Sequence, residues 1–202
     1  MTHGTTAAGQ MNKACHEFRK AWRIIIRRMR DDGLWTTLVW GYARLLPKIT
    51  GIPLLEYSKI TDAVYVGPQH RKAGLAHMAA AGINAVVNMR VEHDDAQHGC
   101  APVAYCYLPT VDDAAPSLEH LRAGVAFMQR VIGDGGKVYI HCKGGIGRAP
   151  SMAIAYFVAE GQSLADAIAL VKRTRPFVNI TSVQMEQLRR FEADQAVHKE
   201  QA

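Results

Sequence analysis

The fold is decided by Lys137-Val138-Tyr139-Ile140-His141-Cys142-Lys143-Gly144-Gly145-Ile146-Gly147-Arg148-Ala149-Pro150-Ser151, a stretch that continues into an apolar run over residues 152–158. Residues 138–140 are β-forming and predict a short buried strand. The three glycines that follow do not propagate regular structure, and Pro150 suits the first turn of a helix, where its missing N–H costs nothing. The stretch therefore predicts a strand, a glycine loop and a helix, with Cys142 opening the loop.

Cys142 and Arg148 occupy positions that suit phosphate chemistry. Loop amides and the helix dipole direct partial positive charge at one spot, which favours both a thiolate and a bound phosphate. The guanidinium of Arg148 can return to that spot and bind two phosphate oxygens. A thiolate, an amide cradle and a fixed guanidinium predict a phosphoryl-transfer site. The predicted phosphate-binding residues are Lys143, Gly144, Gly145, Ile146, Gly147 and Arg148.

Other interpretations explain less of this stretch. A cysteine that is only a small buried hydrophobe leaves the glycines and Arg148 unexplained. The third glycine of a dinucleotide-binding GxGxxG falls on Pro150, and a Walker loop would need Gly-Lys-Ser/Thr. The four cysteines, at positions 15, 100, 106 and 142, lack the paired spacing of a zinc site. We therefore expect neither a metal nor an organic cofactor.

Composition bounds the class of protein. The chain has 202 residues, of which 49% are hydrophobic, enough for one domain with a proper core. Cysteines without a framework pattern favour a reducing, cytoplasmic compartment. No apolar run approaches the roughly 20 residues of a membrane span. A net charge of +6 favours anionic partners such as phosphate esters or acidic lipid surfaces.

The N-terminal part is expected to form a disordered tail over residues 1–12 and a basic amphipathic helical extension over 13–50. Apolar residues such as Trp22 and Met29 recur at helical spacing among arginines. A second apolar stretch, 34–46, is predicted to end at Pro47. Two interpretations stay open: the helices pack on the catalytic domain, or residues 13–46 lie peripherally on an anionic membrane. Nucleic-acid binding is not expected, because the basic residues share a helix with an apolar face.

The following residues, 51–198, alternate between strand and helix signals, which predicts an α/β fold with a largely parallel sheet flanked by helices. The expected strands are 57–66, 83–89, 103–108 and 138–140. The expected helices are 70–81, 117–132, 149–160, 163–174 and 182–196. The intervening loop 90–99 contains His93 and His98, which we interpret as solvated residues and not as metal ligands.

Asp112 and Asp113 follow the third of these strands and are candidates for a general acid, because the leaving oxygen of an ester needs a proton. Acidic residues just before a helix are also common as capping groups. Spacing within one sequence leaves both interpretations open.

His-Cys, five residues and then Arg resembles the signature of the cysteine-dependent protein tyrosine and dual-specificity phosphatase superfamily. The resemblance runs from about Tyr57 to about Phe191. It implies the dual-specificity phosphatase fold, Cys142 as nucleophile, and Asp112 as general acid with Asp113 as the fallback. It also implies that His141 orients the loop and that Lys143 adds charge at the rim.

Within this superfamily the chain most resembles the phosphatidylglycerophosphate phosphatase group, of mitochondrial type and with bacterial relatives. The resemblance implies a phosphate monoester on a phospholipid head group, of phosphatidylglycerophosphate or phosphoinositide type. The alternatives are a phosphatase of phosphoproteins and a catalytically weak phosphate-binding module. Ala149 departs from the Ser or Thr that most members carry after the signature arginine, which implies slower breakdown of the phosphoenzyme.

Overall fold

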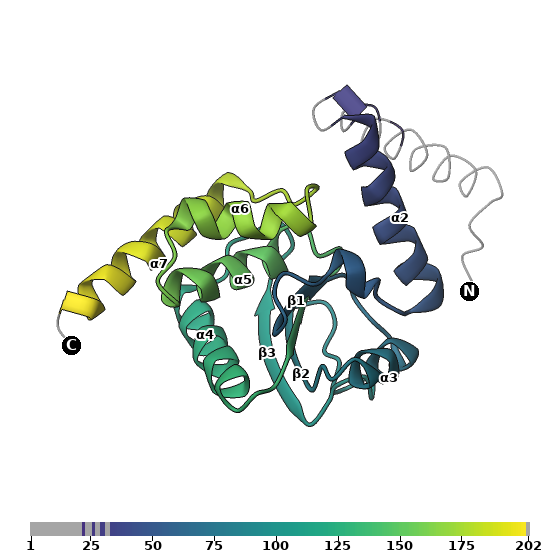
Figure 1. Ribbon diagram of the computed structural model, residues 1–202, viewed down its shortest axis with the longest axis horizontal. Helices are drawn as coiled ribbons and strands as arrows, with labels where there is room; N and C mark the ends of the chain where they lie inside the picture. The colour runs from purple at the N-terminus through teal and green to yellow at the C-terminus, as the bar shows by residue number, and fades with distance from the viewer. Residues whose placement is uncertain (1–21, 23–25, 27–28, 31–32, 201–202) are drawn as a thin grey trace, which may run out of the picture. The chain divides into compact units, whose positions relative to one another are not determined.

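The structure, a computed structural model, describes Trp22, Ile26, Met29, Arg30 and residues 33–200 (Figure 1). The tail expected over residues 1–12, and the helix expected from Lys13 apart from those four residues, lie outside the described residues. The chain divides into two units, Met1–Gly41 and Tyr42–Ala202. Helix α2, Leu34–Thr50, begins in the first unit, and everything described below belongs to the second.

The second unit is built on a four-stranded sheet with the order β1-β4-β2-β3, in which every neighbouring pair is parallel. The strands are β1 Val64–Gly67, β2 Ala85–Arg90, β3 Ala104–Thr110 and β4 Val138–His141. The expected parallel sheet is thus confirmed. Its carboxyl edge carries, after β4, β2 and β3, the three loops in which the candidate site residues lie.

Helices cover both faces of the sheet, as expected for an α/β fold (Figure 1). Helix α3 lies on one face, α4 and α5 lie on the other, and α6 and α7 pack against α5. The helices of the second unit that follow α2 are η1 Leu55–Tyr57, α3 Lys72–Ala80, α4 Leu118–Gly133, α5 Arg148–Ala159, α6 Leu164–Thr174 and α7 Ser182–Glu200. Ser117 and Ser163 cap α4 and α6, each accepting a backbone N–H with its side chain.

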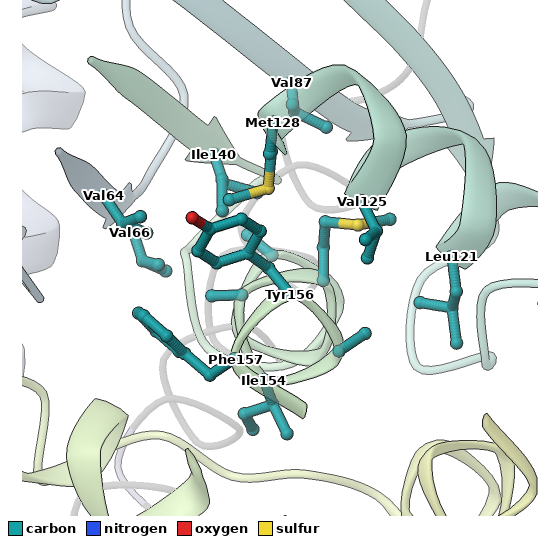
Figure 2. Packing of buried hydrophobic residues seen from close by; sticks show 14 of the residues in the cluster. Val64, Val66, Val87, Leu121, Val125, Met128, Ile140, Ile154, Tyr156 and Phe157 are labelled. Carbon is teal, nitrogen blue, oxygen red and sulfur yellow. The ribbon is translucent and has the colours of Figure 1, made fainter. Parts of the chain in front are cut away.

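Two hydrophobic cores follow from the alternation of side chains along the strands. On the α3 face, Tyr65, Val86 and Tyr139 pack with Met78. On the other face, alternate residues of the same strands pack against α5, whose Tyr156 lies among strand and α4 side chains in Figure 2. Almost every residue of α5 is buried. The helix that begins at the candidate phosphate-binding loop is therefore held on all sides by the main core.

Several boundaries differ from expectation; α7, for example, ends at Glu200 and not at residue 196. The first strand starts at Val64 and not at residue 57, because Leu55–Tyr57 forms a short 3-10 helix. Helix α2 does not end at Pro47 but runs one turn further to Thr50, where Gly51 takes a φ of 74° and donates its N–H to the Pro47 carbonyl. The proline removes one donor but leaves its own carbonyl available. Within the described residues, no helix is both long and apolar enough to cross a membrane.

Candidate active site

The loop between β4 and α5 bounds a pocket of about 160 Å³. Cys142 is buried at 3% exposure and Arg148 at 1%, so only small parts of both side chains reach the pocket. The predicted residues that line it are Asp112, Asp113, Cys142, Lys143, Gly144, Ile146, Gly147 and Arg148. The structure therefore brings residues 112–113 together with the loop 142–148, as the sequence predicted. Gly145 and His141, which were also predicted, are not among the residues that line the pocket. Arg44, Asn179 and Gln184 line the same pocket and were not predicted.

The loop is held in shape by a buried arginine. Gly145 has a φ of 64°, and a Cβ there would lie 2.5 Å from the Gly67 backbone, so glycine is required. Its carbonyl accepts two hydrogen bonds from the guanidinium of Arg175, at 3.2 and 3.1 Å. Arg175 also donates to the Tyr57 carbonyl at 2.6 Å, and burial lowers its pKa to about 10. Arg175 thus ties the loop to the segment before β1.

Arg148 is oriented by Glu92 in the loop after β2 and by Thr110 at the end of β3. Its guanidinium donates to both carboxylate oxygens of Glu92, at 2.9 and 3.1 Å, and to the Thr110 carbonyl at 2.7 Å. Burial alone would lower the pKa of Arg148, but the hydrogen bonds to Glu92 and the charges of Cys142 and Asp112 raise it. The hydrogen bonds from Arg148 in turn lower the pKa of Glu92 to about 2. A charged fork is therefore fixed beside Cys142 before any substrate binds.

Both candidate acids lie at the mouth of this pocket. The Asp112 carboxylate is 58% exposed and lies 2.8 Å from Nη2 of Arg148. Asp113 has a φ of 63°, and its carbonyl accepts a hydrogen bond from the Thr181 hydroxyl at 3.1 Å. Gln184, buried at the start of α7, donates to the Ala114 carbonyl at 3.0 Å. The loop that carries the two aspartates is thus pinned to the start of α7.

A buried cluster lies behind the nucleophile and was not anticipated by the sequence analysis. Nε2 of His141 donates to the Asp95 carboxylate at 2.7 Å, and Nε2 of His70 lies 3.4 Å from the same oxygen. All three side chains are fully buried. Burial would raise the pKa of Asp95, but the hydrogen bond from His141 and the nearby His70 imidazole hold it well below its usual range. Burial lowers the pKa of His141, which Asp95 offsets only in part.

The donor atoms of this cluster lie within 4.8 Å of one another, close enough in principle to ligate a metal ion. The 2.7 Å contact between Asp95 and His141 is the length of a charge-assisted hydrogen bond, and Gln69 donates to the other carboxylate oxygen at 2.7 Å. We therefore describe it as a hydrogen-bonded cluster. His93 and His98, which we expected to be solvated loop residues, stack on each other with ring centroids 3.9 Å apart.

The first turn of α5 contains the position that departs from the superfamily pattern. Ala149 is completely buried. Ser151, two residues further on, donates its hydroxyl to the Gly147 carbonyl at 2.9 Å. The hydroxyl of Ser151 is therefore bound within the loop backbone.

Residues 64–194 match the family model of the dual specificity phosphatase, catalytic domain. Fold and site thus define a cysteine-dependent phosphatase of the phosphoric monoester hydrolase class. Because the match covers more than half of the sequence, the chain belongs to the dual specificity phosphatase catalytic-domain family.

Similar proteins include two human phosphatases. Dual specificity protein phosphatase 5 is 27% identical over 67% of this chain and 35% of its own length. Dual specificity phosphatase 28 is 28% identical over 66% of this chain and 76% of its own length. The matched part of the chain therefore spans about a third of the first relative and about three quarters of the second.

The chain is also similar to solved structures of phosphatases and related proteins. The structure of PTPMT1 in complex with PI(5)P is 25% identical, has a TM-score of 0.65, and covers 70% of this chain and 97% of that one. A structure of human DUSP28 is 25% identical with a TM-score of 0.61, over 70% of this chain and 97% of that one.

Proposed function

We propose that the protein removes the phosphate monoester from a phospholipid head group through a cysteinyl-phosphate intermediate. The Cys142 thiolate attacks phosphorus, and the amides of residues 143–148 and Arg148 hold the equatorial oxygens through a loose transition state. Asp112 gives its proton to the leaving oxygen as the ester bond breaks, with Asp113 as the fallback. His141 orients the loop, and Lys143 adds positive charge at the rim.

The second half of the reaction returns the enzyme to its starting state. The Asp112 carboxylate takes a proton from water, and the water oxygen attacks the phosphorus of the cysteinyl phosphate. The S–P bond breaks, inorganic phosphate leaves, and Cys142 is restored as the thiolate. Proton and phosphate balance without a metal or an organic cofactor.

The lipid assignment rests on the last turns of α2, which carry both a cationic residue of the active-site pocket and exposed apolar side chains. Arg44 lines the pocket that contains Cys142. Leu45 and Ile49, on the same helix, are 60% and 66% exposed. An exposed apolar surface beside cationic residues is typical of a helix that lies in a membrane interface. We infer that 13–50 is an interfacial extension, that 51–198 is the catalytic domain, and that α2 brings the site to membrane-borne phosphates.

Two further observations bear on the substrate. The solved structure of PTPMT1 contains a phosphoinositide. This supports a lipid substrate and the resemblance to the phosphatidylglycerophosphate phosphatase group. Relatives that include human dual specificity protein phosphatase 5 favour a second candidate, a phosphatase of phosphoproteins. The pocket around Cys142 suits a phospholipid and a phosphoprotein equally, because the group that enters it is a phosphate monoester in both substrates.

Phosphate release tests the choice directly. The wild type and Cys142→Ser are compared on phosphatidylglycerophosphate, on phosphoinositides and on phosphotyrosine peptides. We expect turnover that Cys142→Ser abolishes, with kcat/KM at least about tenfold higher for lipid. Higher kcat/KM for peptides would assign the chain to the protein-directed enzymes, and no release from any substrate would favour a phosphate-binding module.

Membrane association is tested separately, on the full chain. Leu45→Gln/Ile49→Gln removes apolar surface, and we expect this double variant to sediment less with anionic vesicles than the wild type does. Val183→Gln is a matched control, because Val183 is 54% exposed and lies on α7. Equal sedimentation of the two variants would contradict the interfacial role of α2.

A further inference from the structure

A second pocket, of about 250 Å³, adjoins the active-site pocket and shares Arg44 and Lys143 with it. We call it the basic pocket. Its lining comes from the last turns of α2, from the segment between β1 and α3, and from the ends of β2 and β4. The lining residues are Arg44, Pro47, Lys48, Pro68, Gln69, Arg71, Arg90 and Lys143. Five of the eight are cationic and none is acidic.

Within the part of the chain that the structure describes, carboxylates lie beside only some of the cations of the basic pocket. Arg90 donates to Glu92 at 3.0 Å and to Gln69 at 2.9 Å. Among the residues that the structure describes, no carboxylate lies within ion-pair distance of Lys48, Arg71 or Lys143. Several cations that line one concave surface attract an anion and repel one another without it. The pocket is therefore suited to a group with at least one negative charge.

Local structure holds these cations in place. Arg44 and Lys48 are four residues apart on α2 and so lie on one side of the helix, an arrangement of like charges that costs helix stability in isolation. The stem of Arg71 packs against Gly51, and its N–H donates to the Gly51 carbonyl at 2.9 Å. The N–H of Gln69 donates to the Lys143 carbonyl at 3.4 Å, which joins the basic pocket to the phosphate loop.

We propose that the basic pocket binds a second phosphate group of the substrate molecule whose phosphate monoester reaches Cys142. This inference rests on the proposed function and adds to it the place of the second phosphate: while the terminal monoester of the head group reaches Cys142, the phosphodiester of the same molecule lies in the basic pocket. The shared wall of Arg44 and Lys143 would contact both groups. A phosphopeptide with a single phosphate would leave the basic pocket without its ligand.

A pair of soluble compounds tests the proposal without a membrane. Glycerophosphoglycerol phosphate carries a monoester and a diester, whereas glycerol 3-phosphate carries the same monoester alone. We expect the wild type to favour the two-phosphate compound in kcat/KM. Lys48→Gln/Arg71→Gln should reduce that preference about 100-fold, mainly through KM, because each of the two lost charged contacts weakens binding about tenfold. An unchanged preference would overturn the proposal.

Two single variants serve as checks: a lysine outside the basic pocket controls for general surface charge, and an exposed lysine of the pocket avoids a change that could disturb folding. Lys172→Gln alters an exposed lysine on α6 that does not line the basic pocket, and it should keep the wild-type preference. Lys48→Gln alone changes an exposed side chain and should by itself reduce the preference. If Lys172→Gln reduced the preference as much as Lys48→Gln, general surface charge and not the basic pocket would be responsible.

Equilibrium binding to Cys142→Ser separates failure of this inference from failure of the proposed function. Tighter binding of the two-phosphate compound, lost on adding Lys48→Gln/Arg71→Gln, supports the basic pocket even if nothing is turned over. Turnover of both compounds without preference supports the phosphatase and overturns the basic pocket. A last assay adds inorganic phosphate to glycerol 3-phosphate. If the added phosphate changes the rate of the wild type but not that of Lys48→Gln/Arg71→Gln, the basic pocket is a site for free phosphate. That result would contradict the proposal that the pocket binds a phosphate group of the substrate.

Discussion

Asp95 places its carboxylate 2.7 Å from Nε2 of His141, the residue directly before Cys142, and both side chains are fully buried. An ionised carboxylate can only accept, so His141 carries its proton on Nε2. The pair connects the loop after β2 with the end of β4 from inside the protein. The catalytic loop is therefore supported from behind by a charged group that the pocket does not expose.

Asp95→Asn should destabilise the fold. The substitution removes a buried negative charge and sets an amide N–H2 against one of the two donors, on His141 or on Gln69, so we expect a loss of roughly 2–4 kcal/mol in the free energy of unfolding at pH 7. Urea denaturation measures it. Asp62→Asn is the control, because the Asp62 side chain is 96% exposed, and it should leave the urea midpoint unchanged. Equal midpoints for the two variants would contradict a structural role for Asp95.

The same pair predicts how stability depends on pH. Burial lowers the pKa of His141 below its unfolded value of about 6.5, so below that pH the unfolded state binds more protons than the folded state. The contribution is fully present above about pH 6.5 and is lost as the pH falls, by up to about 1.4 kcal/mol per pH unit for one histidine.

Urea denaturation between pH 8 and pH 5 measures this loss, since Glu92, with a pKa of about 2, stays ionised throughout. His141→Gln should flatten the dependence by about one proton. His77→Gln, at an exposed histidine on α3, should keep the wild-type dependence. A wild-type slope in His141→Gln would show that another group is responsible.

The strand, loop and helix around Cys142 could be predicted because their signals are local: β-forming residues, glycines and a proline follow one another within fifteen positions. Asp95 and Arg175 could not be assigned in this way. Asp95 contacts a residue 46 positions away, and Arg175 contacts Gly145 from 30 positions away. In sequence each is a polar residue in a loop, and only the folded chain shows that it is buried.

The register of the sheet supplies the missing information for Asp95. Asn88 of β2 pairs with His141 of β4, so the loop after β2 starts beside the residue that precedes the nucleophile. A predicted strand order would have placed residues 90–99 at the site. It would not have shown which acidic residue of this loop has a side chain that points into the protein. For Arg175, the adjacent Pro176 predicts a break between helices but gives no sign of the two carbonyl groups, of Tyr57 and Gly145, that the guanidinium binds.

Asp112→Asn should slow the reaction where the leaving group needs a proton. Its carboxylate lies 2.8 Å from Arg148, at the mouth of the pocket. We expect kcat on an alkyl phosphate to fall roughly 100- to 1000-fold, with a much smaller loss on p-nitrophenyl phosphate, whose leaving group is already a weak base. Asp113→Asn is the matched control, because asparagine tolerates the positive φ of 63° at that position. The reverse pattern would make Asp113 the acid.

Ala149→Ser should speed the breakdown of the phosphoenzyme. Ala149 follows Arg148 in the first turn of α5, and the superfamily resemblance implies that a hydroxyl at this position helps the thiolate to leave. Ser151 does not replace it, since its hydroxyl is bound to the Gly147 carbonyl at 2.9 Å. Rapid mixing with p-nitrophenyl phosphate should give a burst and a slow steady state in the wild type. One added hydrogen bond to a developing thiolate should raise the steady-state rate about tenfold and reduce the burst. Ser151→Ala should change neither, and unchanged burst and steady-state rates in Ala149→Ser would contradict the role of that position.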